Sequence, residues 1–155
     1  MNPVPILCGC WSWSSAIGNF IANFSMLDLF VQDFLEDTLS PEDFLKTKER
    51  PFYDRVERIK GQVAQVDYPA EKKAGFERFF LRLDPLRETR NHIAHGVLRI
   101  GLAPDQKTPV QTLSLPRDLD DSSSPDARHL SFDDLNRESR CLTELIEEFQ
   151  KLTRG

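Results

Sequence analysis

Apolar residues recur at steps of three and four positions in several separate segments of the chain, and this periodicity constrains the fold more than any other feature of the sequence. The longest run spans residues 15–35, and shorter runs lie at 52–66, 76–83 and 135–152. Side chains spaced in this way share one face of an α-helix, whereas a strand needs strict alternation. The sequence therefore predicts a mainly α protein whose helices bury their apolar faces against one another.

Proline and glycine mark where the predicted helices begin and end. Pro51 stands at the first turn of the second helix, and the pair Asp84–Pro85 interrupts the third pattern. This pair leaves two interpretations open, which are a sharp kink within one helix or a new helix running from Pro85 to about His95. Gly96 then suits the left-handed position that closes a helix.

The pattern changes between residues 97 and 130. Two short β-like runs, 97–100 and 110–115, are separated by glycine and proline, and a polar loop follows at 120–125. These runs predict a β-hairpin or an extended insertion. Ser131 to Asp134 then resembles a capping box at the start of the last helix. We therefore expect an antiparallel bundle of four to five helices, with the β insertion placed before the last helix.

The chain has 155 residues, of which 39% are hydrophobic, so it can build one core without disulfide or metal staples. We expect a single helical domain over residues 1–155, in which residues 1–14 form an N-terminal arm. The side chains expected to meet in the core are those of Phe20, Phe24, Leu27, Val31, Ile59, Val63, Phe79, Leu83, Ile93, Leu142, Ile146 and Phe149.

Charge, hydropathy and cysteine usage exclude several classes of protein. The net charge is -5, which gives no general affinity for polyanions, and every apolar stretch falls short of the roughly 18 to 20 residues that a membrane helix needs. Three cysteines cannot all pair, and no C-x-x-C pair begins a zinc site. We expect a reduced, cytoplasmic protein that has no membrane partner and uses no metal or other cofactor.

One segment is locally basic inside this acidic chain. Residues 71–100 hold seven basic and four acidic side chains, so they carry +3 while the rest of the chain carries -8. Such a segment is either a solvated face that balances acidic neighbours or the place where the protein meets a phosphate group.

Within this segment, residues 86–96 combine an apolar stripe with a polar flank. Leu83, Leu86, Ile93, Ala94 and Val97 fall on one side of a helix, and Arg90 is expected to project from the middle of that stripe. A buried, unpaired guanidinium is costly. Arg90 should therefore pair with a carboxylate, such as that of Asp28 or Asp33, or reach through the packing to a cleft.

The polar flank carries the remaining candidates. Arg87, Asn91 and His95 are spaced four apart, so they line one side of the helix together. His95 has an alternative role, in which it bonds the last carbonyls of its own helix. His92 faces away from the predicted stripe, and we expect it to be exposed to solvent.

The run from Arg90 to His95 resembles the R-x4-6-H signature of the HEPN superfamily of helical-bundle proteins, in which a polar residue commonly follows the arginine, as Asn91 does here. The resemblance implies a metal-independent endoribonuclease of the defence or toxin type that works as a homodimer on RNA. Arg90, Asn91 and His95 would then be catalytic, and the neighbouring cations would bind substrate; these are Arg82, Arg87 and Arg99.

Some members of the superfamily lack activity, so the resemblance also implies an alternative. This is a non-catalytic module that binds RNA, a nucleotide or a protein partner. One subgroup carries a tyrosine two residues after the histidine, which a partner antitoxin modifies, but this chain has Val97 there. An antitoxin or regulatory partner of another kind stays open.

Overall fold

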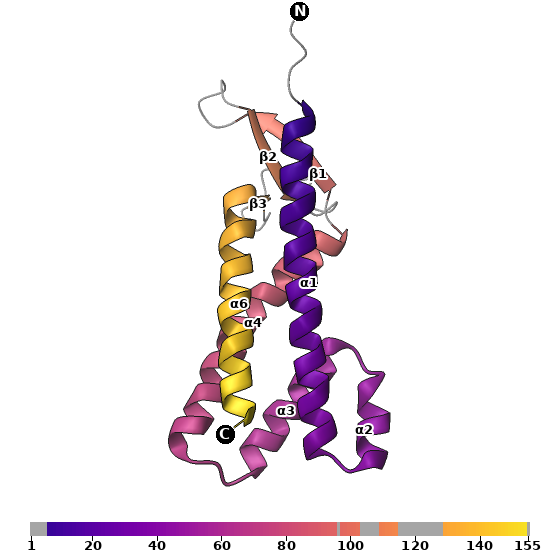
Figure 1. Cartoon of the computed structure of the whole chain (residues 1–155), viewed down its shortest axis with the longest axis vertical. Coiled ribbons are helices and arrows are strands. Elements are labelled where there is room, and N and C mark those ends of the chain that lie inside the picture. Colours follow the sequence, from indigo (N-terminus) through magenta and orange to yellow (C-terminus); the bar gives the residue numbers. More distant parts are fainter. Residues whose placement is uncertain (1–5, 96, 103–108, 115–128, 155) are drawn as a thin grey trace, which may run out of the picture. The chain divides into compact units, whose positions relative to one another are not determined.

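The computed structural model describes residues 6–95, 97–102, 109–114 and 129–154, with side chains at 13–95 and 130–154 (Figure 1). This part of the chain is mainly α, with a small sheet inserted before the last helix, as the sequence predicts. The elements in chain order are α1 (Ile6–Thr38), α2 (Pro41–Lys48), α3 (Phe52–Gln65), α4 (Ala70–His95), β1 (Val97–Leu102), β2 (Pro109–Ser114), β3 (His129–Ser131) and α6 (Phe132–Arg154). None of the described helices is both long and apolar enough to cross a membrane.

The chain forms two compact units, and the boundaries between them fall inside α1, α4 and α6. The first unit comprises residues 1–22 and 85–142, and the second comprises 23–84 and 143–155. All of the predicted core residues are buried except Ile93, which is half-buried.

The second unit is built around an aromatic cluster. Phe149 of α6 packs against Phe79 of α4 and Phe34 of α1, with ring centroids 4.8 and 5.9 Å apart, and Phe34 also contacts Phe76 at 6.1 Å. All of these rings have exposed fractions of 9% or less. Aromatic pairs at these separations contribute about 0.5 to 1.5 kcal/mol each beyond the area they bury. The apolar faces of the three helices are therefore joined by phenylalanine.

The first unit combines the small sheet with parts of the long helices. Strands β1 and β2 pair antiparallel, with Val97 opposite Ser114, and β3 pairs antiparallel with the other edge of β2. The predicted hairpin is thus confirmed, whereas β3 was not predicted. The expected polar loop at 120–125 lies outside the described residues. Buried apolar side chains of this unit include those of Trp13, Phe20, Leu86, Leu130, Leu135 and Leu142.

Two helical segments differ from the sequence-based expectation. Helix α1 begins at Ile6, so residues 6–14 are helical and the predicted arm of residues 1–14 is wrong over that range. Helix α2 occupies an interval without clear periodicity, and Ser40 caps it by accepting a 3.2 Å hydrogen bond from the Asp43 amide.

Helix α4 resolves the two interpretations of the Asp84–Pro85 pair. It runs from Ala70 to His95 as one helix with Pro85 in its interior, so no new helix begins there. The Thr89 hydroxyl donates a 3.2 Å hydrogen bond to the Pro85 carbonyl, one turn back. The last residues of this helix, which include the motif from Arg90 to His95, therefore lie shortly before β1 in the chain. Gly96, expected to close the helix, lies outside the described residues.

Candidate functional site at the end of helix α4

The last turns of α4 bury one narrow face. Leu86, Thr89 and His92 are spaced three apart and have exposed fractions of only 2%, 0% and 5%. The stripe predicted from the sequence included Ala94 and Val97 instead. Ala94 is exposed and Val97 belongs to β1. Compared with the predicted stripe, the buried face of the helix therefore lies further toward Thr89 and His92.

This rotation corrects the expectation for Arg90. The Arg90 side chain is exposed rather than set in the apolar stripe. It therefore needs no buried carboxylate to offset desolvation. Asp28, one of its predicted partners, instead pairs with Arg55 of α3, whose Nη2 lies 2.7 Å from Oδ1 and 2.9 Å from Oδ2. Asp33, the other predicted partner, is exposed.

His92 was predicted to face solvent, and this prediction is wrong. Its Nδ1 lies 3.0 Å from the carbonyl oxygen of Glu88, one turn earlier in α4. Because a carbonyl only accepts, Nδ1 donates the proton in this hydrogen bond. Nε2 is buried and has no hydrogen-bond partner within the described structure. His92 is thus a core residue rather than a residue of the exposed face of α4.

Arg90, Asn91 and His95 share the exposed side of the helix end. Residues of an α-helix follow one another at about 100°, so Asn91 and His95 lie about 40° apart, and Arg90 lies about 100° from Asn91 on the opposite side from His95. None of the three side chains forms a hydrogen bond or an ion pair in the part of the chain that the structure describes.

The three cations predicted to bind substrate lie in different settings. Arg87 is half-buried beside the motif in the first unit. Arg82 belongs to the second unit, where its guanidinium binds the carboxylates of Glu144 and Glu148 at 2.8 Å each. For Arg99 the structure gives only a backbone position in β1. The guanidinium of Arg82 is thus engaged in two ion pairs. Arg87 is the one of the three whose side chain is described and which lies in the same unit as the motif.

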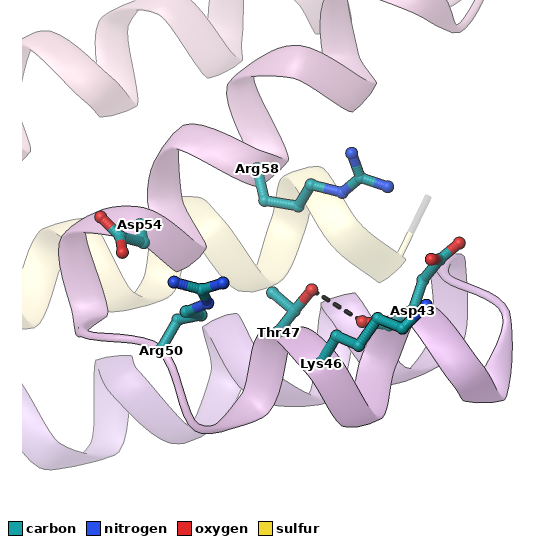
Figure 2. Close-up of a pocket in the computed structure, with 6 residues that line it drawn as sticks. All are labelled: Asp43, Lys46, Thr47, Arg50, Asp54 and Arg58. Atoms are coloured by element: carbon teal, nitrogen blue, oxygen red, sulfur yellow. Dashed lines mark hydrogen bonds between the residues drawn. The ribbon is translucent and has the colours of Figure 1, made fainter.

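A second group of polar residues was not anticipated from the sequence. Helices α2 and α3 enclose an open pocket of about 330 Å³ (Figure 2), here called the α2–α3 pocket, lined by Asp43, Lys46, Thr47, Arg50, Asp54 and Arg58. The residues come from two helices and the turn between them, so no single sequence motif predicts this pocket. The capping sequence that begins with Ser40 and Pro41 was the only local signal for the first of these helices.

Among the described residues, no group of three or more His, Cys, Asp or Glu side chains is arranged to hold a metal ion. The comparisons with family models, with curated proteins and with solved structures found no match to this chain.

Proposed function

We propose that this protein is a HEPN-like, metal-independent endoribonuclease whose reacting groups are His95, Arg90 and Asn91. The observation that supports this proposal is that all three side chains are exposed together at the end of α4 and have no described partner. If these residues had a structural role, we would expect Arg90 to form a buried ion pair with a carboxylate. We would also expect His95 to form a hydrogen bond with the last carbonyls of α4.

The chemistry of the three groups suits RNA cleavage. His95 accepts the proton of a ribose 2′-hydroxyl, and the resulting oxygen attacks the adjacent phosphorus. Arg90 donates to the oxygens of the phosphorane that forms, and Asn91 orients the imidazole or binds a phosphate oxygen. The 5′-oxygen leaves with a proton, which yields a 2′,3′-cyclic phosphate and a new 5′-hydroxyl.

One imidazole cannot act as base and acid in the same step. The proposal therefore includes a homodimer in which His95 of the second copy protonates the leaving 5′-oxygen. The exposed, small side chain of Ala94 lies between Arg90 and His95 in sequence and leaves room for such an approach.

The test is cleavage of single-stranded RNA in EDTA by the parent protein and by His95→Ala and Arg90→Ala. Each substitution should lower the rate by about 10² to 10⁴. Both side chains are exposed, so neither variant should unfold at a lower temperature than the parent. Arg140→Ala is the matched control, because Arg140 is an exposed arginine on α6 in the same unit.

Products that end in a 2′,3′-cyclic phosphate, or in the 3′-phosphate formed from it, support attack by the 2′-hydroxyl. Cleavage that requires a divalent metal, or that is undiminished in His95→Ala, contradicts the proposal. Tight RNA binding that is lost in Arg90→Ala, without any cleavage by the parent protein, favours the alternative of a non-catalytic RNA-binding module.

A further inference from the structure

The α2–α3 pocket is lined by three cations, and two of them are arginines without an ion pair among the described residues. Arg50 lies in the turn before α3, Arg58 lies nearly two turns into that helix, and both side chains are exposed. Neither guanidinium forms an ion pair with any residue that the structure describes. Two guanidinium groups that border one pocket repel each other weakly, and an anion bound between them would relieve this repulsion.

The two carboxylates of the pocket have roles in their own helices, and neither forms an ion pair with Arg50 or Arg58 in the part of the chain that the structure describes. Asp43 accepts a 3.0 Å hydrogen bond from the Ser40 hydroxyl at the start of α2. Asp54 lies in the first turn of α3, where the helix dipole favours a negative charge. Figure 2 shows Asp43 and Asp54 at opposite ends of the group, with Arg50 and Arg58 between them. The middle of the pocket is therefore more positive than its ends.

The other two lining residues fit the same interpretation. Lys46 binds Glu42 at 2.7 Å, but these side chains are 66% and 81% exposed, and such a surface pair is worth little. The ammonium group can therefore turn to an anion at small cost. The Thr47 hydroxyl donates a 2.7 Å hydrogen bond to the Asp43 carbonyl. Thr47 therefore lines the pocket but has no free hydroxyl proton to donate to an anion. Figure 2 shows this hydrogen bond as a dashed line from Thr47 to the backbone of α2.

We propose that the α2–α3 pocket binds a phosphate group through Arg50 and Arg58, with Lys46 as a third cation. The planar guanidinium donates two parallel hydrogen bonds to the oxygens of a phosphate, a geometry that a single halide ion does not use. The phosphate belongs to a free phosphate, to a mononucleotide or to the backbone of an oligoribonucleotide, all of which present the same oxygens. This site is separate from the motif at the end of α4, and it does not depend on the ribonuclease activity proposed above.

The test compares the full-length parent protein with Arg50→Gln/Arg58→Gln and with Lys151→Gln/Arg154→Gln. The second double variant is the matched control, since it removes two positive charges from another open pocket, formed by residues of α6 alone. The probes are inorganic phosphate, adenosine 5′-monophosphate and a short oligoribonucleotide, titrated at low ionic strength and followed by amide NMR shifts. Thermal unfolding of all three proteins checks that the substitutions leave the fold intact.

We expect phosphate-dependent shifts in the amides of residues 47–54 of the parent protein. The dissociation constant of the probe that binds should rise about tenfold in Arg50→Gln/Arg58→Gln and stay unchanged in the control. Binding of inorganic phosphate or the monophosphate supports a small-molecule site, whereas binding of the oligoribonucleotide alone supports a contact with an RNA backbone.

Three outcomes overturn the proposal. The first is equal weakening of probe binding in both double variants, which would report overall charge. The second is amide shifts confined to other parts of the chain. The third is equally tight binding of an acidic peptide that contains no phosphate. Repeating the titration with Arg90→Ala separates this site from the proposed catalytic one, because that variant should lose RNA cleavage and keep the phosphate shifts at residues 47–54.

Discussion

At the scale of single residues, the two histidines at the end of α4 lie in different environments, and only His92 departs from the sequence-based prediction. His92 is buried with one nitrogen bonded to Glu88, and His95 is exposed. The periodicity of apolar residues predicts an exposed His92, because Thr89 and His92 are polar and do not extend the apolar stripe. Polar residues can occupy a core when a hydrogen bond within their own helix offsets part of the desolvation cost.

This difference predicts opposite effects on stability. His92→Ala should lower the free energy of unfolding by about 2 to 4 kcal/mol, because it leaves a cavity in the first unit and removes a buried hydrogen bond. His95→Ala should change that free energy by less than about 0.5 kcal/mol, since an exposed side chain contributes little. Urea unfolding of the two variants and the parent protein measures both values. Equal losses of stability in the two variants would contradict the burial of His92.

At the scale of elements, apolar periodicity predicted the presence of the long helices better than it predicted the residues at which they begin and end. The runs at 15–35 and 52–66 correspond to parts of α1 and to α3, and the capping box of Ser131 predicted the start of α6. The short helix α2 was missed, because its eight residues bury no side chain and so carry no apolar stripe. At the candidate site, spacing predicted the polar flank that holds Asn91 and His95 but wrongly placed Arg90 in the apolar stripe. The α2–α3 pocket depends on residues that only the fold brings together.

The start of α6 gives a pH-dependent prediction. Asp134 accepts hydrogen bonds from the Ser131 hydroxyl at 2.6 Å and from the Ser131 amide at 3.1 Å. The hydroxyl bond is the main cause that holds the pKa of Asp134 below its usual value of 3.8, against the opposing effect of burial, and the Ser131 amide and Arg137 lower it further. A lowered pKa in the folded state means that the charged carboxylate stabilises the fold above about pH 3.8, and that this contribution is lost as the pH falls through the folded value.

Asp134→Asn should therefore cost about 1 kcal/mol at neutral pH, a typical value for a cap. The difference between this variant and the parent protein should shrink as the pH is lowered below 3.8. The measurement is the free energy of unfolding of both proteins from pH 7 to pH 3. A difference that is constant over this range would mean that the carboxylate charge has no part in capping α6.

At the scale of the whole molecule, the first unit contains the motif and the second contains the α2–α3 pocket. Each copy of the chain carries one motif, with a single exposed imidazole at the end of α4. Cleavage by 2′-hydroxyl attack needs one group to remove a proton and another to supply one. If both groups are His95, the active species must contain two copies of the chain, and its activity must depend on both.

This dependence predicts how mixtures of parent and variant protein behave. When equal amounts of the parent protein and His95→Ala are unfolded together and refolded, random pairing leaves about a quarter of the dimers with two intact motifs. Activity per mass of total protein should then fall to about a quarter of the parent value, whereas chains that act alone would retain half. Refolding the parent protein with Arg140→Ala controls for losses during the procedure, because both partners in that mixture keep His95. A value near half, together with a monomeric mass by light scattering at high protein concentration, would rule out the two-histidine mechanism and assign the acid to another group of the same chain.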